Sequence, residues 1–250
     1  RGLAVANASF LRDRMMHDGR VMRTYKNGEA RIPGFLEDHA AVALGLIATY
    51  EMTFDEEWLR LARSIADAMI ASFWDASAKR IYDTAIDAEK LIIRPRDITD
   101  NAMPSGSSLA AELLFHLGDL YDVAEYREIS ASIVASAAPM LAQYPAAFGH
   151  LLGVIDAQIY GATEVALTGS PGSTSFSVLE RAVATTYVPS LVVAGGSGGS
   201  VSDIALMRDR AATDEGAAAY VCRNYTCSAP VSTAAALIAR LESTQEGSDG

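Results

Sequence analysis

The chain has 250 residues, of which half are hydrophobic and 20% are charged, and its formal net charge is -11. This length and composition allow a sizeable core in one large domain, or in one domain with an appendage, and exclude wholesale disorder. The acidic balance argues against nucleic acid as a partner, because Lys and Arg must neutralise its phosphates, and against anionic membrane surfaces.

The sequence shows no segment that indicates export or membrane insertion. The longest apolar run, residues 40–50, is too short to span a bilayer. No basic region followed by an apolar region opens the chain. Arg1 already stands within a helical pattern, so we expect the chain to be part of a longer gene product, and we expect that product to be cytoplasmic.

The first 160 residues predict helices in pairs. Helices are expected over residues 3–16, 36–52, 56–73, 104–120, 123–140 and 148–160. The helices over 36–52 and 104–120 are apolar around their whole circumference, so both should be enclosed by others. The helix over 56–73 has a one-sided apolar stripe and should lie outside them. Inner and outer helices recur with a period of about 70 residues, which indicates a structural repeat.

Turn-rich excursions precede both inner helices. Residues 20–31 alternate around the turn Lys26-Asn27-Gly28 and predict a short hairpin. Residues 74–93 are also turn-rich, and we expect residues 81–84 and 91–93 to be extended.

The pattern changes after Gly161. Short strands are expected over residues 164–168, 191–194 and 217–221, and helices over 175–186 and 232–241. The strand–helix–strand order favours a small βαβ unit with a right-handed crossover. We therefore assign residues 1–160 to a helix-pair region and residues 161–250 to a small α/β appendage.

Polar residues gather at the starts of the two inner helices, where they must meet partners or a water-filled cavity. Glu37, Asp38 and Asp100 are candidate catalytic carboxylates, one of them acting as general acid or base on a sugar with its pKa raised by enclosure. Adjacent helical residues point about 100° apart, so Glu37 and Asp38 cannot both face one substrate. The alternative is that they cap the helix and complement its dipole.

His39 and His150 lie near the starts of predicted inner helices. A pair of histidines could exchange a proton at a sugar carbon beside a carbonyl, as in epimerase chemistry. The alternative for each is a hydrogen-bonded core residue. No group of His, Cys and Asp has the spacing of a metal site, and we expect no cofactor.

The substrate-binding candidates come from the excursions and from the second helix start. They are Arg23, Tyr25, Arg94, Arg96, Asn101 and Ser105. The arginines could clamp a carboxylate or phosphate through bidentate hydrogen bonds, or pair with the chain's own acids. Tyr25 could stack on a sugar or pack in the core. Ser105 lacks the Gly-x-Ser-x-Gly context of a nucleophile elbow, and helix capping is its alternative role.

Cys222 and Cys227 are spaced Cys-x4-Cys, which is not the Cys-x-x-Cys of redox catalysts. If they flank a tight turn, they could oxidise and exchange with a thioredoxin-like partner. Two cysteines in so long a chain do not make a disulfide framework. The favoured prediction is therefore unpaired, partly buried cysteines in a reducing compartment.

Several phrases, taken in order, resemble a known family. They are Asp18-Gly19 with Arg23 and Tyr25, Gly34-Phe35-Leu36-Glu37-Asp38, Phe73-Trp74-Asp75, Arg94-Pro95, Asp100-Asn101-Ala102-Met103-Pro104-Ser105-Gly106, and Tyr220-Val221-Cys222-Arg223-Asn224 with Cys227. Together they are similar to the C-terminal half of the thioredoxin-domain proteins of the spermatogenesis-associated protein 20 type. The resemblance implies an (α/α)6-type toroid, similar to six-hairpin glycosidases and N-acylglucosamine 2-epimerases, with a small α/β tail.

The resemblance also implies partners outside these residues. It implies an N-terminal thioredoxin-like domain and first toroid helices that lie outside these residues. The chain would then carry about half of the helices of a closed toroid, and would be either a fragment or an open layer. Two residues depart from the family pattern: His39 stands where an aromatic such as Tyr is expected, and Ser107 where Asn is expected. Both flank the expected pocket.

The leading hypothesis is a mainly α fold, a partial α/α toroid, whose pocket binds a sugar-like small molecule as an epimerase or glycoside hydrolase does. The rival is a non-catalytic scaffold that binds a client for an attached thioredoxin-like domain. A third hypothesis is thiol redox exchange at Cys222 and Cys227.

Overall fold

The computed structural model describes residues 1–198, 202–213, 216–223 and 226–246. By their contacts the residues form two compact units, Arg1–Leu117 with Ala124–Val154, and Gly118–Val123 with Ile155–Gly250. Helices outweigh strands in the described part of the chain, so the protein is mainly α. None of the described helices is both long and apolar enough to cross a membrane.

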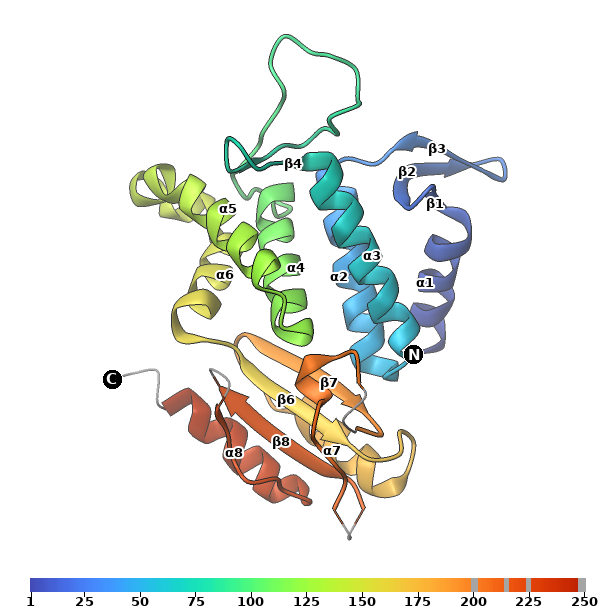
Figure 1. The fold of residues 1–250 in the computed structure, drawn as a ribbon, viewed down its shortest axis with the longest axis vertical. Helices are drawn as coiled ribbons and strands as arrows, with labels where there is room; N and C mark the ends of the chain where they lie inside the picture. The colour runs from blue at the N-terminus through green and yellow to red at the C-terminus, as the bar shows by residue number, and fades with distance from the viewer. Residues whose placement is uncertain (199–201, 214–215, 224–225, 247–250) are drawn as a thin grey trace. The chain divides into compact units, whose positions relative to one another are not determined.

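The first unit is built on helices, as the periodicity predicts (Figure 1). They are α1 (Gly2–Arg14), α2 (Leu36–Thr53), α3 (Glu56–Phe73), α4 (Gly106–Tyr121), α5 (Ala124–Gln143) and α6 (Gly149–Tyr160), with a short 3-10 turn η1 (Pro145–Ala147). Asp55 begins α3 by accepting a hydrogen bond from the Glu57 N–H at 3.0 Å, and the acidic first turn suits the helix dipole. The apolar stripe of α3 is buried along α2, with which it packs.

The two helices expected to be enclosed differ in how far they are covered. Every residue of α4 is buried or half-buried, as expected of a helix that is apolar all round. The α2 helix is covered except for Glu37 in its first turn and a stripe of small residues, Ala41, Gly45 and Ala48, which are exposed. Packing of α5 on α4 is fixed by the buried Ser130, whose hydroxyl donates to the Ala111 carbonyl at 2.6 Å.

The first excursion forms a small antiparallel sheet, as predicted. Its strands are β1 (Met16–His17), β2 (Arg20–Lys26) and β3 (Glu29–Pro33), in the order β1-β2-β3. The β2–β3 pair is a hairpin that aligns Thr24 with Arg31. Asn27 and Gly28 in its turn both have positive φ, which Gly and Asn adopt most readily.

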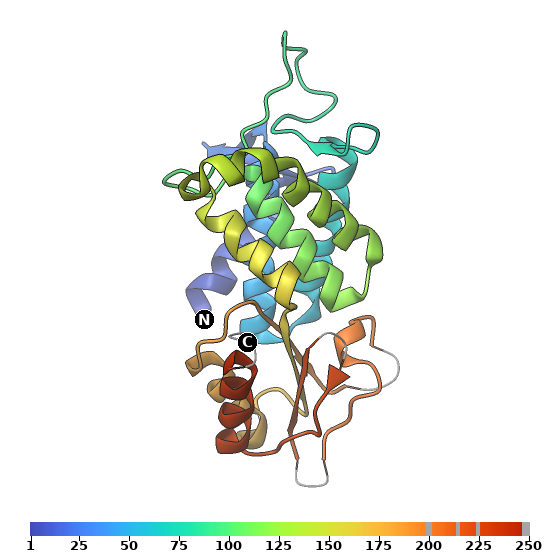
Figure 2. The same ribbon diagram turned by 90° about the vertical axis from the view of Figure 1, so that its left-hand side faces the viewer.

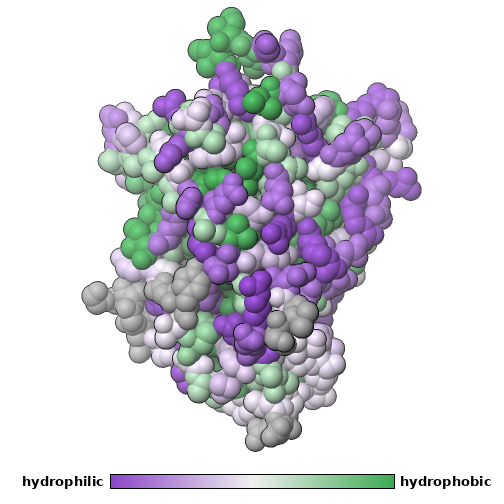
Figure 3. Space-filling view, in the orientation of Figure 1, coloured by the Kyte–Doolittle hydropathy of each residue, from purple (hydrophilic) through white to green (hydrophobic). Residues whose placement is uncertain are grey.

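The second excursion departs from the prediction. Its strands are the short pair β4 (Trp74–Asp75) and β5 (Arg80–Ile81), whereas residues 91–93 are not extended strand. These residues lack a partner strand among the described residues, and Ile92 and Ile93 are largely exposed. Figure 3 shows apolar side chains at the tip of this excursion, which is the projecting loop at the top of Figure 1.

The second unit contains the predicted strand–helix–strand order. Its elements are β6 (Thr163–Thr168), α7 (Thr174–Thr185), β7 (Leu191–Gly196), η2 (Ala205–Met207), β8 (Ala218–Arg223), β9 (Thr226–Cys227) and α8 (Ala234–Glu246). The sheet has the order β7-β6-β8-β9, with β7 parallel to β6 and both other pairs antiparallel. Every residue of β6 is buried, and α7 and α8 lie on the same face of the sheet (Figure 2).

We predict that Gly106→Ala lowers the free energy of unfolding by about 1–2 kcal/mol, because its Cβ would overpack a filled space. That Cβ would lie 3.1 Å from the Glu37 nitrogen and 3.2 Å from Cγ of Leu36, which is fully buried and cannot yield. The matched control is Gly45→Ala, whose Cβ meets nothing within 4 Å; it should stabilise α2 by about 0.5–1 kcal/mol. Urea unfolding measures both, and an equal effect of the two substitutions would contradict the proposed close approach.

Candidate functional site

A cavity of about 540 Å³ lies in the first unit, where the starts of α2 and α4 meet the second excursion. Its polar lining residues are Glu37, Asp83, Thr84, Asp97, Thr99, Asn101 and Ser105, and its apolar ones are Phe35, Pro95, Ala102, Met103, Pro104 and Gly106. Both helix starts that carry the sequence motifs therefore contribute to one hollow.

Backbone hydrogen bonds fix the three segments around the cavity. The Leu36 N–H donates to the Asp83 carbonyl at 3.0 Å, and the Asp83 N–H donates to the Pro95 carbonyl at 3.0 Å. The first bond ties the excursion to the start of α2, and the second folds the excursion back on itself. The absent side chain of Gly106 lets the start of α4 approach Leu36.

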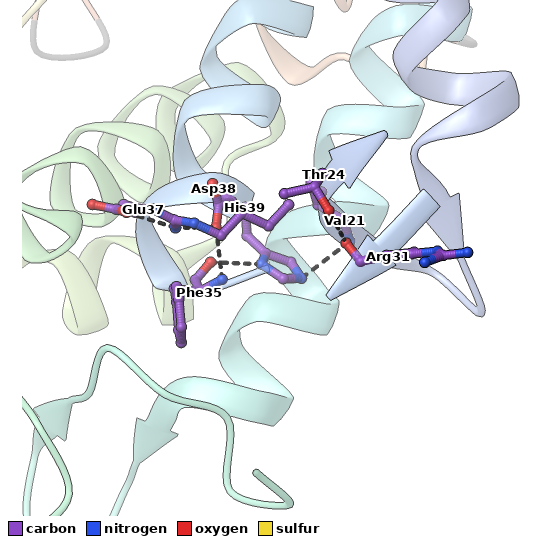
Figure 4. Close-up of polar contacts among 8 residues, drawn as sticks. Val21, Thr24, Arg31, Phe35, Glu37, Asp38 and His39 are labelled. Atoms are coloured by element: carbon purple, nitrogen blue, oxygen red, sulfur yellow. Dashed lines mark hydrogen bonds and ion pairs between the residues drawn. The ribbon is translucent and has the colours of Figure 1, made fainter. Parts of the chain in front are cut away.

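Glu37 and Asp38 take different roles, as their angular separation requires. Asp38 accepts a hydrogen bond from the Phe35 N–H at 2.8 Å and so caps α2, whereas Glu37 lines the cavity (Figure 4). Arg23 donates to both carboxylates at 2.8 Å and lies over the Phe35 ring at 4.9 Å. This arginine therefore pairs with the chain's own acids.

Asp83 and Asp97 are two cavity carboxylates that the sequence analysis missed. Burial, with the negative charges of Asp97 and Glu37 beside it, raises the pKa of Asp83, although the Asp97 N–H donates to its carboxylate at 2.7 Å. Asp97 accepts from the Thr99 N–H at 3.0 Å and from the Thr99 hydroxyl at 2.9 Å. The available signal was weak, because Asp83 stands in a run that was expected to be extended and Asp97 directly follows Arg94-Pro95-Arg96.

Asp100 lies at the start of α6 and is not among the residues that line this cavity. One of its oxygens accepts from the Ser105 N–H at 2.9 Å, and the other accepts from the His150 and Leu151 N–H groups at 2.9 and 3.1 Å. Burial opposes ionisation, but these N–H donors hold the pKa of Asp100 below its ordinary value. The carboxylate thus joins two helix starts, and Asp83 and Asp97 lie where the sequence suggested Asp100.

His39 is buried and is held by two backbone groups (Figure 4). Its Nε2 accepts from the Val21 N–H at 3.2 Å, so its Nδ1 carries the proton and donates to the Phe35 carbonyl at 2.8 Å. Burial lowers the pKa of His39. A neutral ring with both nitrogens engaged ties β2 to the start of α2.

His150 is separate from His39 in its contacts and does not line the cavity. It hydrogen-bonds Glu112 of α4 through Nε2 at 2.9 Å, which raises the pKa of His150. Burial disfavours the charged form of Glu112, but the hydrogen bond from His150 holds the pKa of Glu112 below its ordinary value. No described contact joins the two histidines that were predicted as a pair.

Three further candidates serve the protein's own packing. Arg94 donates through Nε and Nη2 to the Thr84 carbonyl at 3.0 and 2.6 Å and stacks on the Tyr82 ring at 4.4 Å. Tyr25 packs edge-on against Phe10, with ring centroids 5.0 Å apart. Arg96 donates to the Ser136 hydroxyl, and burial lowers the pKa of Arg96. The buried Nε of Arg96 has no hydrogen-bond partner within the described part of the chain.

Asn101 and Ser105 both line the cavity. The Asn101 residue is exposed, and among the described residues its side-chain amide makes one long contact, 3.5 Å, to the Thr99 carbonyl. The Ser105 hydroxyl accepts from the Ser108 N–H at 3.1 Å, as a helix cap does. Asn101 is therefore the more available of the two for a ligand.

The preferred prediction for the cysteines is wrong. Cys222 and Cys227 form a disulfide between β8 and β9, where antiparallel pairing sets their Cα atoms 3.9 Å apart. The spacing of the two cysteines in the sequence does not show that they are directly opposed on paired strands. Among the described residues, no group of three or more His, Cys, Asp or Glu side chains could hold a metal ion.

The chain is similar to proteins named spermatogenesis-associated protein 20. It is 26% identical to the one from Homo sapiens and 25% identical to the one from Rattus norvegicus, over 91% of this chain and 31% of each relative. An uncharacterized protein from Caenorhabditis elegans is 24% identical over 82% of this chain and 28% of its own length. The chain spans about a third of the length of the curated relatives it matches. No family model matches it.

We predict that His39→Phe lowers the free energy of unfolding by about 1–3 kcal/mol at pH 8, because the buried Val21 N–H loses its acceptor. Because the pKa of His39 is lowered in the folded state, its contribution to the free energy of unfolding is full above the unfolded-state pKa of about 6.5. That contribution becomes smaller as pH falls below this value. The difference between the two proteins in urea unfolding should therefore shrink from pH 8 to pH 5. The exposed His17→Phe should change stability by less than about 0.5 kcal/mol, and a pH-independent difference for His39 would contradict its neutral state.

The pair of His150 and Glu112 should give the opposite pH dependence. Because the pKa of His150 is raised, its stabilisation of the folded state is full below about pH 6.5 and is lost as pH rises through the folded-state pKa. The pKa of Glu112 is lowered, so its stabilisation is present above about pH 4.5. We expect His150→Gln to destabilise by up to about 1 kcal/mol at pH 5.5 and by less at pH 8.5. Glu112→Gln should remove the same pH-dependent part in thermal unfolding; an equal loss at both pH values would exclude the ion pair.

Proposed function

We propose that the cavity between the starts of α2 and α4 binds a sugar-like small molecule and performs general acid/base chemistry on it, as a glycoside hydrolase does. The observation that carries the proposal is the set of carboxylates in the cavity, Glu37, Asp83 and Asp97. Its volume of about 540 Å³ suits a small ligand, since binding pockets range from about 300 to 1,000 Å³.

The different surroundings of the carboxylates support different roles. Asp83, whose pKa is raised by burial and by neighbouring acids, retains a proton more readily and is the proposed general acid. Glu37 is half exposed beside Arg23 and is the proposed base or nucleophile. Glycoside hydrolysis uses two carboxyl groups, one as general acid and the other as base or nucleophile.

Other features of the cavity suit a neutral polyol. Phe35 supplies an apolar ring at the rim, on which a sugar face can stack, and Asn101 supplies an exposed amide. The epimerase alternative is less supported, because the His39 ring is engaged by backbone groups on both sides. In this proposal the paired helices α2–α3 and α4–α5 are part of an α/α toroid, which the resemblance to six-hairpin glycosidases suggests.

The test combines binding with turnover. A library of neutral mono- and oligosaccharides is screened by thermal shift, since a ligand that binds only the folded state raises the melting temperature, and aryl glycosides are used to follow hydrolysis. Asp83→Asn should reduce turnover by about 100-fold or more while leaving binding within a few-fold. The matched control is Glu29→Gln on the β2–β3 hairpin, which changes an exposed carboxylate away from the cavity.

The pH profile supplies a second readout. A general acid must be protonated, so turnover should fall as pH rises through the raised pKa of Asp83, and Asp83→Asn should remove this limb. Unchanged sugar binding and turnover in both Asp83→Asn and Glu37→Gln would refute the assignment.

A second candidate is a scaffold that binds a protein client for a thioredoxin-like domain of the longer protein. The exposed apolar tip of the second excursion, formed by Leu91, Ile92 and Ile93, favours it, because exposed apolar clusters often mark protein contacts. Replacing all three with Ser should abolish client capture and leave sugar binding intact, whereas the cavity variants should do the reverse.

A further inference from the structure

The disulfide in the second unit is asymmetric in its exposure. Cys222 on β8 is 1% exposed, whereas Cys227 on β9 is exposed. In the sheet order β7-β6-β8-β9, β9 is at the edge. A thiol that approaches from solvent therefore meets the Cys227 sulfur, and the Cys222 sulfur is the one that would be displaced.

Arg210 lies against both sulfurs. Its Nη2 donates to the Cys227 sulfur at 3.0 Å and to the Cys222 sulfur at 3.3 Å. The guanidinium is held in place by a hydrogen bond from Nη1 to the Leu206 carbonyl and by the Tyr220 ring, which is 5.9 Å from its central carbon. A fixed cation at this position is a weak partner for a neutral disulfide and a strong one for a thiolate.

Two opposing influences act on the charge of Arg210. Burial lowers the pKa of Arg210 and the negative charge of Glu164 opposes that effect, but an arginine remains charged at neutral pH. Glu164 is buried on β6, directly opposite Cys222 in the register. A half-buried guanidinium therefore contacts the disulfide and feels the charge of a buried carboxylate.

A purely structural purpose gains little from this bond. The two cysteines are five residues apart in sequence, and cross-linking so short a loop removes less chain entropy than cross-linking a long one. The register of β8 on β6 is already fixed by a full antiparallel ladder. An exposed sulfur can be attacked by a thiol, and a fixed cation can stabilise the thiolate that leaves, so both features suit a disulfide that opens.

We propose that Cys222–Cys227 is a thiol–disulfide exchange site that accepts electrons from an external dithiol protein, with Arg210 as the group that stabilises the leaving thiolate. This inference is independent of the function proposed for the cavity, because the described contacts of Arg210 and both cysteines lie within residues 155–250.

The exchange occurs in two balanced steps. A partner thiolate attacks Sγ of Cys227, a partner–Cys227 disulfide forms, and the Cys222–Cys227 bond breaks with its electron pair leaving on Sγ of Cys222. The partner's second thiolate then attacks the partner sulfur of the mixed disulfide and releases Cys227 as a thiolate. The partner ends as a disulfide, both cysteines end reduced, and the two protons of the partner's thiols are available to Cys222 and Cys227.

The test measures reduction of the folded chain by dithiothreitol, a dithiol probe, and by glutathione, a monothiol probe, at pH 7. The reaction is quenched at intervals with an alkylating reagent, and mass spectrometry measures the fraction of chains in which both cysteines are alkylated. Arg210→Gln should slow reduction by about ten-fold, and Arg210→Lys, which keeps the charge, should retain most of the rate. The matched control is Arg208→Gln, which removes a nearby guanidinium whose hydrogen bonds go to the Ser202 and Asp203 carbonyls and should stay within two-fold of the wild type.

Single cysteine variants test which sulfur is attacked. Cys222→Ser leaves the exposed Cys227, which should form a mixed disulfide with oxidised glutathione at least ten-fold faster than the buried Cys222 does in Cys227→Ser. The pH dependence of alkylation of Cys222 in that second variant should shift upward when Arg210→Gln is added, which a merely structural arginine would not cause.

Three results would overturn the proposal. They are equal reduction rates in the wild type and Arg210→Gln, faster reaction of Cys222 than of Cys227, and a disulfide that dithiothreitol reduces only after the chain is unfolded. Asp83→Asn should leave every one of these rates unchanged, so failure of the cavity proposal and failure of this one are distinguishable.

Discussion

The close approach of α2 and α4 at their N-terminal ends is the constraint on which the first unit depends. Gly106 has no side chain, and this lets the start of α4 lie against the fully buried Leu36. The same Leu36 offers its N–H to the carbonyl of Asp83 in the second excursion. One small contact therefore brings two helix starts and a loop together, and the cavity is the space that remains between them.

Helix ends explain how the polar residues of this region are divided. The first N–H groups of a helix have no partner within it, so nearby oxygens are used to satisfy them. Asp38, Asp100 and Ser105 are engaged in this way. Glu37 and Asp83 line the cavity instead. The chemistry proposed here uses the carboxylates that the backbone does not fully occupy.

The cations follow a similar division. Arg23 neutralises the acids beside it and Arg94 is held by backbone carbonyls, so neither is free to clamp an anionic ligand. A cavity that is lined by carboxylates, and in which neither of these arginines is available to a ligand, suits a neutral ligand better than a phosphate or carboxylate. The cavity carboxylates would repel an anionic ligand. In the second unit Arg210 is placed differently, since its partners are two sulfurs that carry charge only after reduction.

The sequence alone determined the elements that depend on local periodicity and turn chemistry: the helix pairs, the β2–β3 hairpin and the strand–helix–strand order of the second unit, together with the placing of polar residues at the helix starts. The tertiary structure decided which of those residues face the cavity. Asp83 and Asp97 reach Glu37 only because a long excursion folds back. His39 is neutral because the fold buries it and brings the N–H of the distant Val21 to its ring. Cys222 meets Cys227 because the antiparallel pairing of β8 and β9 sets them opposite each other. Periodicity records which side of one element is apolar, but the contacts between elements depend on where the chain returns in space, and a single sequence does not specify that locally.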